Sequence, residues 1–421
     1  NSASTAESPD GVSWETAFQD IQSAVDNTYI RRGSGEIWIA KGTYTSSSEN
    51  VVTMRYDTHL YGGFDGTEIN REDRDWERNP TIIDGELKRR CVAGSSDSTF
   101  DGFNVTRGAA FQGGGMHNIY VSSTTIQNCH FYGNTSVKYG GGIFNSYRSD
   151  PEVIGCLFDN NSAGIEGGGM CNAYYSSPTI MDCYFKENNA GSGGGISNFN
   201  RSSPVFDKCF VLSNSAGGGG GMSNTDYSFP HITDCQFIGN NADTAGGIYI
   251  DNGQFFHVLF NKCVINDNHA KYNGAGIFGE GLGPIYLINC LVAGNSSEEL
   301  FGGGICLLGT PAYLSNCTIV NNAAPAGGAL FGDNGGFAVI DNSIVWGNSS
   351  GVNADAEIEY SCIQDVFPGE GNIYTDPLFA YAANGDYRLR SGSPCIDIGY
   401  AMYPQLEDLT GTVRPQGEGF D

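Results

Sequence analysis

Short apolar patches recur through the middle of the chain at steps of 25 to 29 residues. Each period carries three patches, and within a patch apolar and polar residues alternate over three to five residues. This alternation is the spacing of strands and not of helices. Three short strands repeated at a fixed period predict an all-β, single-stranded parallel β-helix, in which about 26–27 residues form one coil.

A repeated cysteine marks the phase of the coils. It is followed two residues later by an apolar residue and five residues later by asparagine. The cysteines, with one serine in their place, are Cys129, Cys156, Cys183, Cys209, Cys235, Cys263, Cys290, Cys317 and Ser343. The asparagines are Asn134, Asn161, Asn188, Asn214, Asn240, Asn268, Asn295, Asn322 and Asn348. In the same phase, an apolar residue follows small residues at Met116, Ile143, Met170, Ile196, Met222, Ile248, Ile277, Ile305 and Leu330.

Stacking of coils gives each column a physical role. Equivalent residues in successive coils are expected about 4.8 Å apart, so that inward Phe, Ile and Val form continuous apolar columns. The cysteines fill a small buried slot. Asparagine at a turn can bond through its amide to the asparagine one coil away. A second column is expected to point inward as an amide ladder, and comprises Asn118, Asn145, Asn172, Asn198 and Asn224.

The two ends of the chain lose this period. Apolar residues over Thr16–Asp26 lie on one helical face, with Ser13 as a candidate N-cap, which predicts a helix that plugs the first coil. We expect an N-terminal cap and irregular coils over 1–110, regular coils over 111–350, and irregular last coils with a C-terminal cap over 351–421. In the first region we expect strands at Glu36–Ala40, His59–Phe64, Thr81–Asp84 and Phe100–Val105, with an excursion at Asp65–Arg78.

Charge excludes some partners. The chain has 21 basic and 47 acidic residues and a formal net charge of −26. Nucleic acid and anionic membranes are disfavoured, because phosphate binding needs a cationic surface. Polyuronates are disfavoured too, unless a divalent cation forms a bridge. No stretch of about 20 apolar residues is present, so no transmembrane segment is expected.

Of the thirteen cysteines, Cys91 stands alone and the other twelve fall into three groups. Eight belong to the repeated column and are expected to stay reduced, because their side chains point the same way and a bridge would be strained. Cys171 and Cys306 follow the inward residue of another column, so we expect them to face outward and to be available to a second chain. Cys362 and Cys395 are candidates for an intrachain disulfide.

Several motifs carry a family resemblance. Gly113–Met116 and Gly327–Leu330 read GGGM and GGAL, whereas Phe131–Asn134 and Phe158–Asn161 read FYGN and FDNN. The chain resembles the pectin-lyase-like superfamily of right-handed parallel β-helix proteins. Its repeats also resemble those of chlamydial polymorphic outer-membrane proteins, which are surface adhesins. The resemblance implies a right-handed coil and a secreted or cell-surface location, but this fold hosts lyases, hydrolases, adhesins and structural proteins.

Outward positions four to five residues after the glycine-linked apolar column gather tyrosine and arginine. Such a stripe could hold a glycan, with tyrosine rings stacked on sugar faces and arginines on carboxylates. A plain strand edge is the alternative, since tyrosine and arginine are common there. The candidate ligand-binding residues are Tyr120, Tyr147, Arg148, Asp150, Tyr174, Tyr175, Arg201, Asp226 and Tyr227.

Metal sites are weakly indicated. Calcium needs six to eight oxygens from a shaped loop, and no acidic cluster here shows an EF-hand or nonapeptide pattern. The six histidines lack the spacing of a zinc site. We therefore expect no cofactor, with Ca²⁺ as the alternative. The acidic clusters are Asp65 with Glu68, Glu72–Asp73 with Asp75, and Asp355 with Glu357 and Glu359.

Two classes of function compete. We expect a non-catalytic surface protein that acts by contact with glycans or by self-assembly into a layer, sheath or filament. The alternative is a secreted polysaccharide lyase or glycoside hydrolase, and a binding module within a larger enzyme is a third reading. An enzyme needs a cluster that interrupts the regular coils, and the least regular coil, Ile248–Cys290, carries Asp251, His257, Asp267, His269 and Lys271.

Overall fold

The computed structural model describes residues 5–253, 257–400 and 407–412. The chain is an all-β parallel right-handed β-solenoid of about 12 turns, with one helix near its N-terminus and mostly three sheets per coil. It divides into two compact units, residues 1–210 and 211–421. Each unit is described by itself.

Three parallel sheets, A, B and C, run through the first unit, and a fourth sheet, D, is shorter. Sheet A contains β1 (Gly35–Ala40), β4 (Thr58–Phe64), β7 (Thr99–Asp101), β11 (Thr125–Gln127), β15 (Glu152–Ile154), β19 (Thr179–Met181) and β23 (Val205–Asp207). Sheet B contains β2 (Gly42–Tyr44), β5 (Thr81–Asp84), β8 (Phe103–Thr106), β12 (His130–Tyr132), β16 (Leu157–Asp159) and β20 (Tyr184–Lys186). Sheet C contains β3 (Asn50–Thr53), β6 (Arg90–Ala93), β10 (Met116–Ile119), β14 (Ile143–Ser146), β18 (Met170–Ala173) and β22 (Ile196–Phe199). Sheet D contains β9 (Ala109–Gln112), β13 (Thr135–Tyr139), β17 (Ser162–Ala163) and β21 (Asn189–Ser192).

The second unit repeats the same four kinds of strand, and β24 (Phe210–Leu212) contains the residue at which the first unit ends. Its A strands are β27 (His231–Thr233), β31 (Val258–Asn261), β35 (Ile285–Ile288), β39 (Pro311–Ser315), β42 (Phe337–Asp341) and β45 (Asp355–Glu359). Its B strands are β28 (Gln236–Ile238), β32 (Val264–Asn266), β36 (Leu291–Ala293), β40 (Thr318–Val320), β43 (Ile344–Trp346) and β46 (Cys362–Ile363). Its C strands are β26 (Met222–Asn224), β30 (Ile248–Asn252), β34 (Ile277–Gly281), β38 (Ile305–Leu308), β41 (Leu330–Asp333) and β44 (Val352–Asn353). Its D strands are β25 (Ser215–Gly218), β29 (Asn241–Thr244), β33 (His269–Ala270) and β37 (Ser296–Ser297), and β47 (Phe379–Tyr381) pairs antiparallel with β48 (Asp386–Leu389) near the C-terminus. The short 3-10 helices are η1 (Arg71–Asp73) and η2 (Ala382–Asn384).

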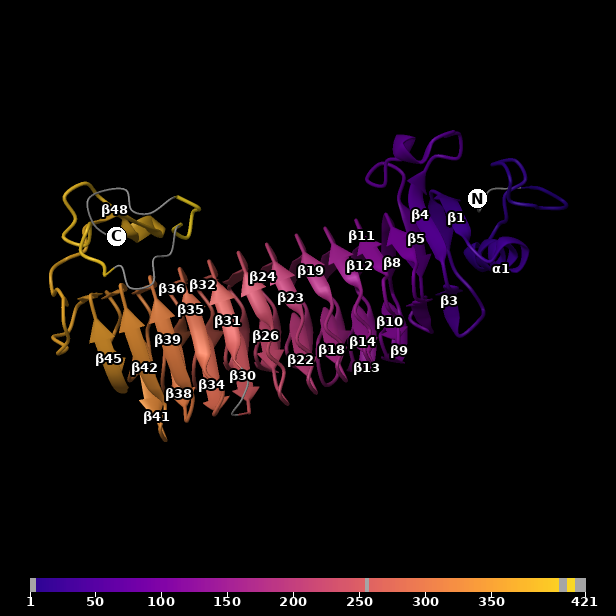
Figure 1. Cartoon of the computed structure of the whole chain (residues 1–421). Helices are drawn as coiled ribbons and strands as arrows, with labels where there is room; N and C mark the ends of the chain where they lie inside the picture. The colour runs from indigo at the N-terminus through magenta and orange to yellow at the C-terminus, as the bar shows by residue number, and fades with distance from the viewer. Residues whose placement is uncertain (1–4, 254–256, 401–406, 413–421) are drawn as a thin grey trace. The chain divides into compact units, whose positions relative to one another are not determined.

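The stacking that the sequence predicts is confirmed. In the first unit β10, β14, β18 and β22 lie side by side (Figure 1), and the glycine-linked column is in register from Met116 through Ile143 and Met170 to Ile196. These four side chains are fully buried. Because one inward column is in register, the cysteine, phenylalanine and asparagine columns of the same coils are in register as well.

Two polar columns run inside the first unit beside an aromatic one. Phe158 stacks on Phe131 at 5.2 Å and on Phe185 at 4.6 Å. Asn161 Nδ2 donates to the Oδ1 of Asn188 at 3.0 Å, and the Nδ2 of Asn145 donates to the Oδ1 of Asn172 at 2.8 Å. Both asparagine columns are buried as expected, and these amides bond to the coil beside them. At the start of the inner column, the Oδ1 of Asn118 has no hydrogen-bond partner.

The N-terminal helix begins later than the sequence suggested. We expected it over Thr16–Asp26 with Ser13 as N-cap, but α1 covers Ile21–Arg32. Asp20 is the N-cap, and its carboxylate accepts the backbone N–H of Ser23 at 2.7 Å. The prediction of Ser13 as the N-cap was therefore wrong. Aspartate and serine are about equally good N-caps, so residue preference alone does not choose between them.

Helix α1 closes the first coil, where it lies against β1 and β3 (Figure 1). Gln22 bonds twice to the backbone of Thr53 in β3: its Oε1 accepts the N–H at 2.7 Å, and its Nε2 donates to the carbonyl at 3.2 Å. Asp26 adds an ion pair to Arg55 at 3.0 Å. The side chain of Gln22 therefore replaces a neighbouring strand at the exposed edge of β3.

The predicted three strands per coil are confirmed, and many turns add a short fourth strand in sheet D between the asparagine column and the glycine turn. One other expectation needs correction. The strand expected at Phe100–Val105 is two strands, β7 and β8, because Gly102 turns the chain between them with φ of 80°. The excursion at Asp65–Arg78 contains no strand, as predicted, and holds η1.

Candidate functional site

A repeated, strained turn places the predicted stripe on the surface of the first unit. After β14, β18 and β22 the chain turns toward sheet A through two successive residues in the left-handed region. The first pair is Tyr147 and Arg148, with φ of 56° and 61°, and the second is Tyr174 and Tyr175, with φ of 57° and 65°. Bulky side chains cost of order 1–3 kcal/mol each in this region. Single left-handed residues also occur at other turns of the coils, such as Asp182 and Lys208. We call this turn, with the side chains that it presents, the corner.

Tyrosine rings form one column along the corner. The rings of Tyr120 and Tyr147 are 5.4 Å apart, and those of Tyr147 and Tyr174 are 4.7 Å apart and nearly parallel. The ring faces therefore cover one another within the column, which leaves few of them open to a sugar. The column presents ring edges and hydroxyl groups to solvent, and its end member Tyr120 is 69% exposed.

A second column at the corner alternates cations with an aromatic ring. The guanidiniums of Arg148 and Arg201 lie 5.9 and 5.6 Å from the ring centre of Tyr175. Arg201 also donates to the hydroxyl of Tyr175 at 2.7 Å. Arg148 and Arg201 belong to coils that are separated by one other, which puts their backbones about 10 Å apart. Two fixed positive charges therefore face solvent on a chain that is acidic overall.

The remaining predicted residues have other surroundings. Asp150 accepts the backbone N–H of Ser177 at 2.5 Å, so it ties one coil to the next. Asp226 and Tyr227 lie in the second unit, where they form a left-handed pair of the same kind, and Tyr227 is 47% exposed.

The two cysteines expected on the surface are buried, so that expectation was wrong. Cys171 packs with Phe144 and Phe199 outside sheet C, and Tyr139 and Tyr174 cover this cluster. Cys306 lies in a similar cluster in the second unit. Burial raises the pKa of the Cys306 thiol to about 12 and raises that of Cys171 well above its usual value. Aromatic residues outside the coil form a second apolar layer, which leaves neither thiol accessible to another chain.

Cys362 and Cys395 are close together, as the sequence suggested, but they are unbonded thiols. The thiol of Cys362 donates to the carbonyl of Thr375 at 3.2 Å, and the interaction between the two thiols raises the pKa of Cys362 and lowers that of Cys395. The disulfide stays a prediction, and it would tie the C-terminal cap to β46.

Thiol labelling tests both the burial of the cysteines and the predicted disulfide between Cys362 and Cys395. Because all 13 cysteines are buried, we expect at most about one to react with a thiol reagent in the folded protein. In denaturant, 13 should react if all are reduced, and 13 − 2 = 11 should react if Cys362 and Cys395 are paired. Rapid native labelling of Cys171 or Cys306, located by peptide mass spectrometry, would contradict the buried positions. A reduced sample is the control.

One of the acidic clusters considered for calcium, Asp65 with Glu68, is engaged within the protein. Glu68 accepts the backbone N–H groups of Asp65, Gly66 and Thr67, and Asp65 pairs with Lys41. In the ranges that the structure describes, no group of three or more His, Cys, Asp or Glu side chains could hold a metal ion. His117 is buried 3.1 Å from the hydroxyl of Ser146, and burial lowers the pKa of this histidine to about 3.

The irregular coil of the second unit brings together a pair that the sequence did not reveal. Asp251 in β30 is in register with Glu280 in β34, and Tyr249 donates a hydrogen bond to Glu280. Burial and the charge of Glu280 raise the pKa of Asp251. A signal existed in the sequence, because residues 29 positions apart become neighbours across this longer coil.

The other residues named in that coil are not part of this cluster. His269 lies in β33 with Nε2 3.5 Å from a carboxylate oxygen of Glu298, and Lys271 lies 4.8 Å from the ring centre of Tyr272. His257 has the ring of Tyr286 5.5 Å away. Asp267 lies between β32 and β33. Among its described residues, the coil therefore holds one carboxylate pair and several separate polar groups.

Comparison with models of protein families agrees with the architecture. A family model described as a right handed beta helix region matches residues 166–292. The middle of the chain is a right-handed β-helix. Among solved structures, the crystal structure of pectate lyase Pel9A is similar at 14% identity and a TM-score of 0.38, covering 100% of this chain and 87% of that one. A search of curated proteins finds no match. Across the described ranges, no helix has the length and apolar character needed to cross a bilayer.

Proposed function

We propose that this chain is a secreted or cell-surface β-helix protein that acts by contact and holds a linear glycan along the corner. The observation that carries the proposal is recurrence: exposed tyrosine and arginine side chains occupy the same turn in successive coils. A repetitive ligand matches a repetitive surface, whereas catalysis needs one distinct cluster of groups. The likeness of the GGA-apolar and F-x-x-N repeats to chlamydial surface adhesins supports an adhesive role.

The chemistry of the corner defines the ligand. Stacked rings leave tyrosine hydroxyls and ring edges to bond sugar hydroxyl groups, and Tyr120 offers one open ring. Arg148 and Arg201 can each pair with a carboxylate, but the net charge of −26 repels a densely charged polyuronate. We therefore propose a linear glycan with few or widely spaced carboxylates.

Substitutions at the corner test this function. Tyr147→Asn together with Tyr174→Asn should weaken glycan binding about tenfold or more, because each lost hydroxyl contact contributes roughly 1 kcal/mol. Asparagine is chosen because it tolerates the left-handed backbone, and it occurs naturally at Asn200 in the equivalent turn. Affinity electrophoresis and calorimetry against neutral and uronate-containing glycans give the measurement.

Matched variants separate this site from general surface effects. Tyr184 is 44% exposed, as is Tyr147, but it lies in sheet B and not at the corner. Tyr184→Ala should therefore leave glycan binding unchanged. Arg148→Gln with Arg201→Gln should reduce binding of carboxylate-bearing glycans more than that of neutral ones. Unchanged affinity in both corner double variants would exclude the corner, and concentration-dependent association without glycan would favour self-assembly instead.

A polysaccharide lyase or hydrolase is the second candidate, and the Asp251–Glu280 pair with Tyr249 is the observation that favours it. Two carboxylates with unlike surroundings can serve as acid and base. The assay is turnover of pectate, alginate, chondroitin and neutral glycans with and without Ca²⁺, followed by unsaturated product and reducing ends. Turnover lost in Glu280→Gln would favour the enzyme, and no turnover would favour contact.

A further inference from the structure

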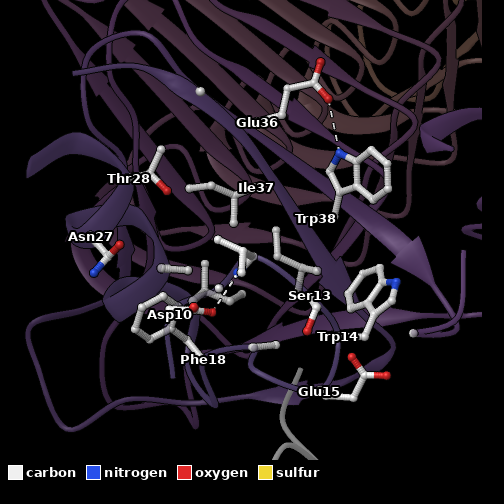
Figure 2. Close-up of a pocket in the computed structure, with 18 of the residues that line it drawn as sticks. Asp10, Ser13, Trp14, Glu15, Phe18, Asn27, Thr28, Glu36, Ile37 and Trp38 are labelled. Atoms are coloured by element: carbon white, nitrogen blue, oxygen red, sulfur yellow. Dashed lines mark hydrogen bonds between the residues drawn. The ribbon is translucent and has the colours of Figure 1, made fainter. Parts of the chain in front are cut away.

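A hollow of about 820 Å³ opens in the N-terminal cap of the first unit. Its walls come from residues 10–18, helix α1, strand β1 and the loop at residues 66–69. Figure 2 shows Trp14 and Trp38 on one side and Asn27 and Thr28 of α1 on the other. We call this hollow the cap pocket. Its volume lies within the range of small-molecule sites, which is about 300–1,000 Å³.

One wall is aromatic and held in place. The rings of Trp14 and Trp38 are 6.4 Å apart and tilted by 42°. Trp14 donates its indole N–H to the carbonyl of Glu68 at 2.9 Å, and Trp38 donates to the carboxylate of Glu36 at 3.1 Å. Phe64 stacks on one face of Trp38 at 5.0 Å. Because their N–H groups are engaged, the two half-buried indoles present apolar planes and edges to the hollow.

The facing wall is polar. Asn27 and Thr28 are half-buried, and neither side chain makes a hydrogen bond with any residue in the described part of the chain. A half-buried amide and hydroxyl gain when a ligand bonds to them. Aromatic planes facing an amide and a hydroxyl suit a ligand that has an apolar face and a hydroxyl-bearing edge.

Charge argues against an anionic ligand. The lining has five carboxylates and two guanidiniums, which favours positive or neutral ligands. Most of these carboxylates already have partners within the protein: Asp20 caps α1, Glu36 pairs with Arg71, and Glu68 accepts three backbone N–H groups. A ligand that brings a positive charge is therefore not required. The charged lining residues are Asp10, Glu15, Asp20, Glu36, Glu68, Arg31 and Arg32.

We propose that the cap pocket binds one or two units of a neutral saccharide. The C–H face of a sugar ring lies against Trp14 and Trp38, and its hydroxyl groups bond to Asn27 and Thr28. This site goes beyond the proposed function, since it uses different residues from the corner and accepts a chain end or a short saccharide instead of an extended glycan. The protein would then hold two kinds of sugar contact in its first unit.

Tryptophan fluorescence gives a direct test, because the chain has four tryptophans and two of them line the pocket. In the full chain carrying Trp76→Phe and Trp346→Phe, the tryptophan fluorescence comes from Trp14 and Trp38 alone. Titration with neutral di- to tetrasaccharides should give a saturable change for at least one of them, and the matching uronate oligosaccharides should bind about tenfold more weakly. Calorimetry on the natural chain checks that the two background substitutions do not alter binding.

Asn27→Ala with Thr28→Val removes the polar wall with little change in helix stability or volume, since alanine favours helices and valine matches threonine in shape. Binding should fall about tenfold while the melting temperature is kept. The corner variant Tyr147→Asn with Tyr174→Asn should bind as the natural chain does, which separates failure of one site from failure of the other. Three results would overturn the proposal. They are the absence of a saturable signal with any neutral saccharide, tighter binding of uronates or of a fatty acid, and full binding in the Asn27 and Thr28 variant.

Discussion

Replacing Phe158 by alanine is expected to lower the free energy of unfolding by about 3–5 kcal/mol. The side chain is fully buried, and its ring lies between those of Phe131 and Phe185 at 5.2 and 4.6 Å. Truncation would leave a cavity bounded by two rings that the backbone ladders prevent from closing. Denaturant unfolding followed by circular dichroism gives the measurement.

The control for Phe158 is Phe111→Ala. Phe111 is 57% exposed and has the ammonium of Lys138 4.9 Å above its ring, so its loss should cost less than about 1 kcal/mol. Because solenoids can unfold in parts, transition midpoints are compared together with the steepness of each curve. A loss below about 1 kcal/mol for Phe158→Ala as well would show that the aromatic column does not stabilise the core.

Asn161→Ala is expected to cost roughly 3–6 kcal/mol, because it removes a partner from several buried groups at once. The Oδ1 of Asn161 accepts both the backbone N–H and the Nδ2 of Asn134, at 3.1 and 3.0 Å, and its Nδ2 donates to the carbonyl of Phe131 at 2.8 Å. Alanine leaves these groups buried and unpaired. The same denaturation experiment measures the loss.

The adjacent asparagine is a matched control. Asn160 is exposed and left-handed with φ of 53°, so Asn160→Gly keeps the backbone shape and should change stability by less than about 0.5 kcal/mol. Asn161→Asp keeps the volume but cannot donate, and should be nearly as harmful as alanine. Equal effects of Asn160→Gly and Asn161→Ala would argue against an energetic role for the amide ladder.

The repeating part of the fold could be predicted because each column has one physical requirement. Met116 and Ile143 must be apolar to face the core, and Asn134 and Asn161 must offer both a donor and an acceptor to the next coil. Because the same residue type is required at the same place in every coil, it recurs in the sequence at the length of one coil. The start of α1 could not be fixed in this way, since it occurs once and Asp20 competes with Ser13 for the same role.

The outer surface was harder to predict because it lacks such a requirement. Alternation placed Cys171 outside the coil correctly, but it could not show that Tyr139 and Phe199 cover the outer face of sheet C there. The positions of Tyr147 and Tyr174 were predicted, but their mutual stacking was not, because it depends on a left-handed turn that only the coordinates show. The cap pocket also escaped notice, since its walls come from segments that do not repeat.

The bond between Gln22 and Thr53 bears on how copies of this protein can associate. A bare strand edge invites another chain to add to it, and an unprotected β-helix could grow from its first coil as a fibre does. Here one glutamine side chain occupies both the donor and the acceptor of Thr53, at 2.7 and 3.2 Å. A second chain would have to displace it before adding to β3. Polymerisation by strand addition is therefore opposed at this position of the β3 edge, and the helix that carries Gln22 would have to move for it to occur.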